Sequence, residues 1–261
     1  MAASAALQGV EALIFDVFGT VVNWRGSVTK ELVDLGTKYS LPDSAQDWQE
    51  FANEWRAGYL ENTRRIAEGG SGSNNVDVMH REILESMLSS SRWQHVGKVL
   101  NEEARVHLNL VWHRLDGYSD TVPGLYELKK NVIIATLSNG NIRLLVDMAK
   151  HADLPWDAVF SGALFNSYKP NPVTYQGALT HLSLSDTPHK VAMVAAHIYD
   201  LRAAAKVGLK TIYIPRPDEE TDGAKSEDVK SKEQGGEVDV VVQDFRELAR
   251  LFLPSHGKPR L

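Results

Sequence analysis

Polar residues that could carry out covalent and acid–base chemistry follow apolar segments at three widely separated places in the chain. They are Asp16, the pair Ser138 and Asn139, and the pair His197 and Asp200. A carboxylate becomes an effective nucleophile once it is oriented and freed of water, and an imidazole transfers protons near neutral pH. Lys169, in the sequence Tyr-Lys-Pro-Asn-Pro, adds a cation that could keep a neighbouring carboxylate ionised.

The apolar segments that precede these residues have the character of buried strands. Five such runs occupy residues 11–15, 131–137, 190–196, 210–214 and 238–242. Helical patterns follow at 141–151, 200–207 and 244–252, and Gly208 is a helix stop signal. Buried strands that alternate with helices indicate an α/β fold with a doubly wound parallel sheet and a Rossmann-like core.

Ligands of such sheets bind beyond the carboxyl ends of the strands, so the polar residues are expected at one common edge. Each of them alone has an ordinary structural interpretation. Asp, Ser and Asn often cap turns and helices, a lone lysine is usually solvated, and a lone histidine is usually a hydrogen-bonded structural residue. Their convergence is what favours a site.

Residues 23–115 differ from the rest of the chain because they contain helical patterns and no strong strand run. Trp48, Phe51, Trp55 and Tyr59 recur at spacings of three and four, which places them on one helix face. We expect a helical cap domain at 23–115, inserted after the first strand, and a core domain made of 1–22 and 116–261. The sheet is expected to resume near 121–124, and the Pro-, Gly- and charge-rich segment 216–237 is expected to form an exposed loop.

Composition narrows the range of functions. The 261 residues contain no cysteine, which excludes disulfides, thiolate catalysis and zinc–cysteine sites. The net charge of -6 and the lack of a basic run argue against a nucleic-acid partner. The apolar runs are far shorter than a membrane span, so we expect a cytoplasmic protein with no membrane partner. Aromatic residues of the cap could also support a homodimer.

Four short motifs, taken together, resemble those of the haloacid dehalogenase superfamily. They are 16–20 (Asp-Val-Phe-Gly-Thr), 138–140 (Ser-Asn-Gly), Lys169 within Tyr-Lys-Pro, and 195–200 (Ala-Ala-His-Ile-Tyr-Asp). Their order and spacing are those of the superfamily, and the resemblance covers nearly the whole chain. Within it, the sequence is most similar to the type II 2-haloacid dehalogenases, which implies a hydrolase that acts on carbon–halide bonds.

This subfamily assignment depends on two acidic residues that the phosphatases of the superfamily carry and this chain lacks. Phe18 stands where they have the general acid, and Ala196 stands where they have an acidic Mg²⁺ ligand. Mg²⁺ requires near-octahedral oxygen ligands, which Asp16 and Asp200 alone supply poorly. The resemblance therefore implies a reaction without metal or cofactor, on a 2-haloacid as the small-molecule substrate.

The resemblance also implies a role for each site residue. Asp16 would form an ester with the substrate carbon, Thr20 would hydrogen-bond to Asp16, and Lys169 and Asp200 would balance charge and hold the hydrolytic water. The residues expected to bind substrate are Phe18, Arg56, Ser138, Asn139 and Tyr175, with Arg56 and Asn139 meeting the departing halide and Ser138 the carboxylate. His197 replaces a polar amide of well-described members and could polarise the water.

Three other functions remain open. The same aspartyl-ester chemistry fits fluoroacetate or a strained ring such as azetidine-2-carboxylate. A Mg²⁺-dependent small-molecule phosphatase is a second possibility, opposed by Phe18 and Ala196. A non-catalytic binding protein on this fold is a third, opposed by the joint presence of Asp16, Ser138, Lys169 and Asp200.

Overall fold

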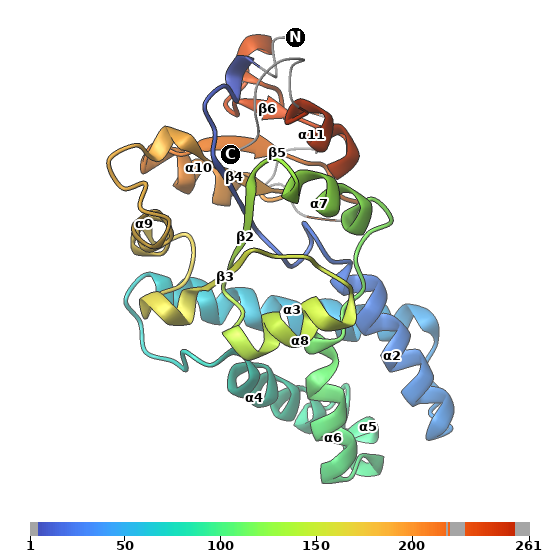
Figure 1. The fold of residues 1–261 in the computed structure, drawn as a ribbon. Coiled ribbons are helices and arrows are strands. Elements are labelled where there is room, and N and C mark those ends of the chain that lie inside the picture. Colours follow the sequence, from blue (N-terminus) through green and yellow to red (C-terminus); the bar gives the residue numbers. More distant parts are fainter. Residues whose placement is uncertain (1–4, 218, 220–227, 254–261) are drawn as a thin grey trace.

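The computed structural model describes residues 5–217, 219 and 228–253, and it is built around one parallel sheet. The sheet has six strands in the order β3-β2-β1-β4-β5-β6 (Figure 1). The strands are β1 Ala12–Phe15, β2 Ile133–Ser138, β3 Ala158–Ser161, β4 Val191–Ala195, β5 Lys210–Tyr213 and β6 Val240–Val241. The α/β fold with a parallel, Rossmann-like sheet is therefore confirmed.

The register of the central strands sets the position of the polar residues. Phe15, the last residue of β1, pairs with Thr136 of β2 on one side and with Val194 of β4 on the other. The amide of Asp16 still donates to the carbonyl of Val194, at 3.0 Å. The three strands therefore end at nearly the same level, and the residues that follow them face one another.

Helices cover both faces of the sheet, and each face has its own apolar cluster. Helices α7 Thr121–Lys129, α8 Ile142–His151 and α11 Phe245–Leu251 pack on one face. Helices α9 Pro172–His181 and α10 Ile198–Lys206 pack on the other. Gly208 has φ +90° two residues after the last residue of α10, as its role as a stop signal predicts.

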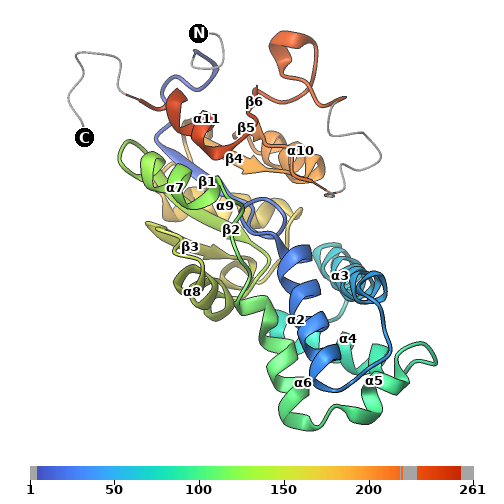
Figure 2. The same cartoon turned by 90° about the vertical axis from the view of Figure 1, so that its right-hand side faces the viewer.

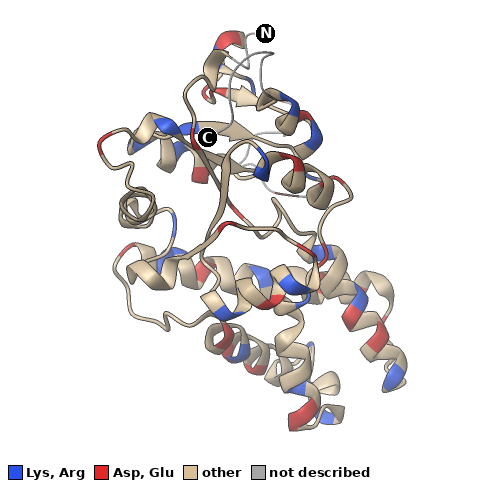
Figure 3. Cartoon of the chain, viewed as in Figure 1, with Lys and Arg blue, Asp and Glu red and all other residues tan. Residues whose placement is uncertain are grey.

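The stretch between β1 and α7 is helical and stands apart from the sheet (Figure 2). It contains α2 Trp24–Lys38, α3 Ala45–Ala67, α4 Val76–Ser89, α5 Gln94–Val99, α6 Glu102–Asn109 and the 3-10 turn η1 Leu110–His113. Acidic and basic side chains are interspersed along these helices (Figure 3). A single bridge between Val22 and Gly117 brings together the two segments that lead into and out of them.

Helix α3 is the longest element, and its apolar face is buried as its periodicity predicts. Trp48, Phe51, Trp55 and Tyr59 are all at most 3% exposed. A capping box starts the helix: the Ser44 hydroxyl accepts from the amide of Asp47, and the Asp47 carboxylate accepts from the amide of Ser44. The start and direction of this helix are thus fixed before it crosses the ends of the strands.

The structure corrects one expected element of the core and adds a strand and several short turns. Residues 121–124 open helix α7 instead of the sheet, because Pro123 lies in the first turn, where no intrahelical amide is needed. Strand β3 was not expected, and three further 3-10 turns, η2 Gly162–Phe165, η3 Pro188–Lys190 and η5 Lys232–Gln234, join the larger elements. None of the helices within the described residues is long and apolar enough to cross a membrane.

The segment 216–237 is only partly an exposed loop. Arg216 is 8% exposed and binds both carboxylate oxygens of Asp120, at 2.7 and 3.0 Å. Its Nε also donates to the carbonyl of Thr20, at 2.8 Å. Arg216 thus fixes the turn after β1 to the start of α7, while residues 218 and 220–227 lie outside the described part of the chain.

We predict that Asp120→Asn lowers the free energy of unfolding by about 3 kcal/mol, because it leaves the buried Arg216 without its countercharge. Urea denaturation followed by circular dichroism measures this change. Asp34→Asn is the matched control, since Asp34 pairs with Lys30 on the surface, where the two side chains are 64% and 74% exposed. A loss below about 1 kcal/mol for both variants would contradict the role assigned to the buried pair.

Candidate active site

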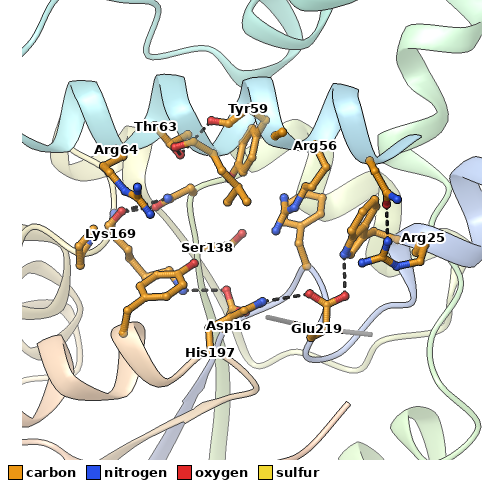
Figure 4. Close-up of a pocket in the computed structure, with 18 residues that line it drawn as sticks. Asp16, Arg25, Arg56, Tyr59, Thr63, Arg64, Ser138, Lys169, His197 and Glu219 are labelled. Carbon is orange, nitrogen blue, oxygen red and sulfur yellow. Dashed lines mark hydrogen bonds and ion pairs between the residues drawn. The ribbon is translucent and has the colours of Figure 1, made fainter. Parts of the chain in front are cut away.

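A cavity of about 560 Å³ lies between α3 and the carboxyl ends of the central strands (Figure 4). It is lined by predicted site residues from both sides: Asp16, Phe18, Arg56, Ser138, Asn139, Lys169 and His197. Helix α3 supplies the roof, and the segments after β1, β2 and β4 supply the floor. The site therefore combines one helix of the inserted stretch with one edge of the sheet.

The centre of the floor is a lysine between two carboxylates. Lys169 Nζ lies 2.8 Å from Asp16 Oδ1 and 2.5 Å from Asp200 Oδ2. The Tyr175 hydroxyl donates to the other oxygen of Asp200, at 2.5 Å. Lys169, Asp16 and Asp200 are all buried, so their charges interact with little screening by water.

The charges in this group stabilise one another. Burial opposes ionisation of Asp16, but Lys169 and the hydrogen bond from His197 outweigh it and hold the pKa of Asp16 well below its usual range. Burial also opposes the charge of Lys169, yet the two carboxylates raise the pKa of its ammonium. Asp16 is consequently an ionised carboxylate at any ordinary pH.

The second oxygen of Asp16 is bound by one residue of the same turn and by one residue of the segment after β4. Thr20 Oγ1 donates to Asp16 Oδ2 at 2.8 Å, and His197 Nδ1 lies 3.0 Å from the same oxygen. Thr20 Oγ1 in turn accepts from the amide of Ala196, at 2.9 Å. The carboxylate is therefore held at both oxygens and has little freedom to rotate, which is the orientation that nucleophilic attack requires.

His197 also contacts a residue that the sequence did not indicate. Its Nε2 lies 3.1 Å from Glu219 Oε2, and Glu219 Oε1 accepts from Trp24 Nε1 at 2.7 Å. Burial lowers the pKa of His197, but the carboxylates of Asp16 and Glu219 together raise it to about 9. The ring is then a doubly protonated cation at neutral pH, so before the ester forms it cannot polarise the water as a base in the way the sequence analysis expected.

Arg56 lies on the face of α3 that covers the cavity. Its guanidinium carbon is 5.4 Å from the ring centres of Phe18 and Trp24, and 4.7 Å from that of Tyr59. The Nη1 atom is buried and has no hydrogen-bond partner among the described residues. A buried, unsatisfied donor costs free energy unless a ligand accepts from it, so this guanidinium can receive an anion.

Ser138 and Asn139 lie at the end of β2, next to Lys169. The Asn139 side chain accepts from the amide of Lys169 and donates to its carbonyl, at 2.7 and 3.3 Å. Ser138 Oγ accepts from the amide of Gly140, which leaves its own proton free for a ligand. Asn139 thus fixes the position of the lysine segment in addition to lining the cavity.

Three of the predicted residues do not line the cavity and instead contact residues that bear on it. Tyr175 was expected to bind substrate, but it is fully buried behind Asp200 and does not line the cavity, because its hydroxyl is aimed at the Asp200 carboxylate. Thr20 and Asp200 also stand behind the wall, where they hold Asp16 and Lys169. These three are positioning residues.

Several lining residues had no role in the sequence interpretation. They are Trp24, Arg25, Asn53, Thr63, Arg64, Tyr199 and Glu219. Arg64 follows Arg56 by two helical turns, so the periodicity of α3 could have indicated it. Glu219 lies in a charge-rich segment that gave no sign of entering a site.

The residues present fit a metal ion poorly. Among the residues that the structure describes, no group of three or more His, Asp or Glu side chains is arranged to hold one. Lys169 Nζ lies between Asp16 and Asp200 and forms an ion pair with each carboxylate. An ammonium at this position supplies the countercharge that a metal would otherwise provide.

The family model, the curated relatives and the solved structures that this chain resembles all point to one family. Residues 10–208 match the model of the haloacid dehalogenase-like hydrolases. The (S)-2-haloacid dehalogenase 4A of Burkholderia cepacia is 25% identical over 224 residues, which cover 80% of this chain and 85% of that protein.

Two solved structures are more similar in sequence. The L-2-haloacid dehalogenase PA0810 is 36% identical with a TM-score of 0.78, and the match covers 92% of this chain and 98% of that one. The defluorinating L-2-haloacid dehalogenase Rha0230 is 34% identical with a TM-score of 0.81, over 94% and 96% of the two chains.

We predict that His197 titrates with a midpoint of about 9, observed as the ¹⁵N shifts of its imidazole. The folded value lies above the ordinary 6.5, so the ring stays protonated through neutral pH and loses its proton as the pH rises through about 9. Glu219→Gln removes one of the two carboxylates and is expected to move the midpoint toward 6.5. Glu237→Gln, a surface carboxylate paired with Arg202, is the control. A midpoint near 6.5 in the unaltered protein would contradict the assignment.

Proposed function

The chain belongs to the haloacid dehalogenase-like hydrolases, and within this family we propose that it is a hydrolytic dehalogenase that converts short 2-haloacids to 2-hydroxy acids. The observation that carries the proposal is that one cavity holds both an ionised, immobilised Asp16 and an Arg56 whose Nη1 has no hydrogen-bond partner among the described residues. A nucleophile and a cation for the leaving group are the two parts that displacement of halide from carbon requires. The three related dehalogenases support the same reaction.

In the first step, an oxygen of Asp16 attacks the carbon that bears the halogen. The carbon–halogen bond breaks, the halide leaves with the electron pair, and an ester forms between Asp16 and the substrate. Negative charge moves from the carboxylate to the halide, so Arg56 stabilises the transition state more than the ground state. Ser138, which has a free hydroxyl proton, is placed to hold the substrate carboxylate.

In the second step, water attacks the carboxyl carbon of the Asp16 ester. Asp200 is already occupied by Lys169 and Tyr175, so the proton acceptors left at the cavity wall are His197 and Glu219. Esterification removes the negative charge of Asp16, which is one of the two causes of the raised pKa of His197. The ring can then release its Nδ1 proton to solvent, which is the one proton that the overall reaction liberates, while Glu219 holds the Nε2 proton in place.

His197 Nδ1 thereby becomes a base that faces the ester. It takes the proton of the attacking water, the bond from the Asp16 carbonyl to the ester oxygen breaks, and the departing alkoxide takes the proton back. The attack leaves Asp16 as a carboxylic acid, which passes the second proton of the water to the neutral His197 Nδ1, 3.0 Å away. The products are the 2-hydroxy acid, the Asp16 carboxylate and the protonated imidazole with which the cycle began. In this account the imidazole donates to Asp16 before the displacement and acts as a base only after it.

We predict that Asp16→Asn abolishes halide release from 2-chloropropionate, by at least about a thousandfold in kcat, because an amide is a far weaker nucleophile than a carboxylate. Ion chromatography of chloride, bromide and fluoride from a panel of 2-haloacids measures the release. Circular dichroism of the variant checks that it folds. Substantial turnover by pure variant protein would overturn the nucleophile assignment.

The same panel separates the proposal from a phosphatase. Dehalogenation is expected to be unchanged by EDTA, since Lys169 supplies the cation beside Asp16. Turnover of p-nitrophenyl phosphate that is lost with EDTA and restored with Mg²⁺ would favour the phosphatase instead.

We predict that His197→Gln uncouples the two steps. A glutamine side chain still offers a hydrogen bond to Asp16 but cannot accept the proton of water. Rapid quench is expected to show a burst of close to one halide per enzyme, followed by turnover slowed about a hundredfold or more, the usual contribution of a general base. Mass spectrometry of the quenched protein should detect the ester. A variant with no burst and equally slow steps would assign His197 to the displacement alone.

A further inference from the structure

We propose that the cavity contains a second anion-binding position at Arg64, and that the preferred substrates are 2-haloacids with a second carboxylate at the far end of the chain. The inference rests on the proposed dehalogenase function and narrows its substrate class to short 2-halodicarboxylates.

The first observation is the placement of Arg64 on α3. Arg64 follows Arg56 by eight residues, which corresponds to about 12 Å along a helix axis. Both residues line the cavity, and Figure 4 shows their side chains descending from α3 on opposite sides of Tyr59. One guanidinium thus lies at the reaction end of the roof and the other lies farther along it.

The second observation is that no residue the structure describes is a hydrogen-bond or ion-pair partner of Arg64. Within the described part of the chain, its guanidinium makes no hydrogen bond or ion pair, whereas the adjacent Arg65 donates to Asn62 Oδ1 at 2.6 Å. Both arginines are exposed, and Arg64 lines the cavity while Arg65 does not. The two neighbouring arginines therefore differ in two respects: Arg65 has a protein partner, whereas Arg64 lines the cavity and its donors are open to a ligand.

The third observation is the balance of charge. The carboxylates of the site are committed, since Lys169 lies between Asp16 and Asp200 and His197 lies between Asp16 and Glu219. The departing halide accounts for Arg56. The single carboxylate of a simple 2-haloacid is assigned to Ser138. Such a substrate therefore leaves Arg64 without an anionic group to bind.

The fourth observation gives the direction of the substrate chain. Glu219, which is bound by Trp24 and His197, places a negative charge on the other side of the cavity from Arg64 (Figure 4). A second carboxylate would be repelled there and attracted to Arg64. The volume of about 560 Å³ is that of pockets for much larger ligands than a three-carbon acid, so the longer chain has room.

The test compares pairs of acids with equal chain length that differ only in the terminal group. The pairs are 2-bromobutyrate and 2-bromosuccinate, 2-bromovalerate and 2-bromoglutarate, and 2-bromohexanoate and 2-bromoadipate. Bromide release is expected to give a higher kcat/KM for at least one diacid than for its monoacid partner. Arg64→Gln is expected to reduce this preference about tenfold, mainly through KM, the effect of losing one charge-assisted hydrogen bond.

Arg65→Gln is the matched control, because it removes the same charge from the same helix turn outside the cavity. It should leave the ratio of diacid to monoacid unchanged at constant ionic strength. If monoacids are dehalogenated but no diacid is preferred, or if Arg64→Gln and Arg65→Gln change the ratio equally, the inference is wrong and the dehalogenase function stands.

A binding measurement separates failure of the inference from failure of the function. Thermal-shift titrations with glutarate and butyrate, which contain no halogen, are carried out on the unaltered protein and on both variants. Stabilisation by glutarate that exceeds that by butyrate and is lost only in Arg64→Gln supports the anion position even if no acid in the panel releases halide. Equal stabilisation by the two acids contradicts it.

Discussion

The ammonium of Lys169, buried between the carboxylates of Asp16 and Asp200, is the interaction on which the site depends. Burying three charges is expensive, and the group is stable only because each charge has a close partner and further hydrogen bonds. Those partners come from three segments, after β1, before α9 and within α10, so the parallel register of the sheet must be correct before any of them is satisfied. The ion pairs that hold these segments together are therefore the same ones that keep Asp16 ionised.

The helical stretch contributes what a sheet edge lacks, which is a roof that limits water. The aromatic face of α3 is packed into the inserted helices, and this leaves the side of the helix with Arg56 over the nucleophile. Because Phe18, Trp24 and Tyr59 surround the guanidinium, little water competes for its donors. An anion that reaches Arg56 in these surroundings is bound more strongly than at an exposed arginine.

The sequence predicted the parts of the fold that local patterns determine. The apolar runs before Asp16, Ser138 and His197 are β1, β2 and β4, and their ends meet as a parallel sheet requires. Strand β3 was missed because it is a short strand at the edge of the sheet, half of it only partly buried, and it lacks a long apolar run. Tyr175 was misplaced because a motif gives spacing along the chain and not the direction of the hydroxyl. Glu219 could not be found, since a carboxylate in a charge-rich segment has the composition of a solvated loop.

The segment after β5 shows how a site can depend on residues far from its motifs. Arg216 holds the carbonyl of Thr20, and Glu219 holds His197, so two residues of this segment act on the two groups that bind Asp16 Oδ2. Glu219 also lies directly against Gly19, where a Cβ atom would come within 2.4 Å of its carboxylate. Gly19, at φ +81°, therefore serves both the turn and the close approach of Glu219. Any larger residue there would displace the carboxylate, and the imidazole would lose the partner that fixes which of its nitrogens faces the nucleophile.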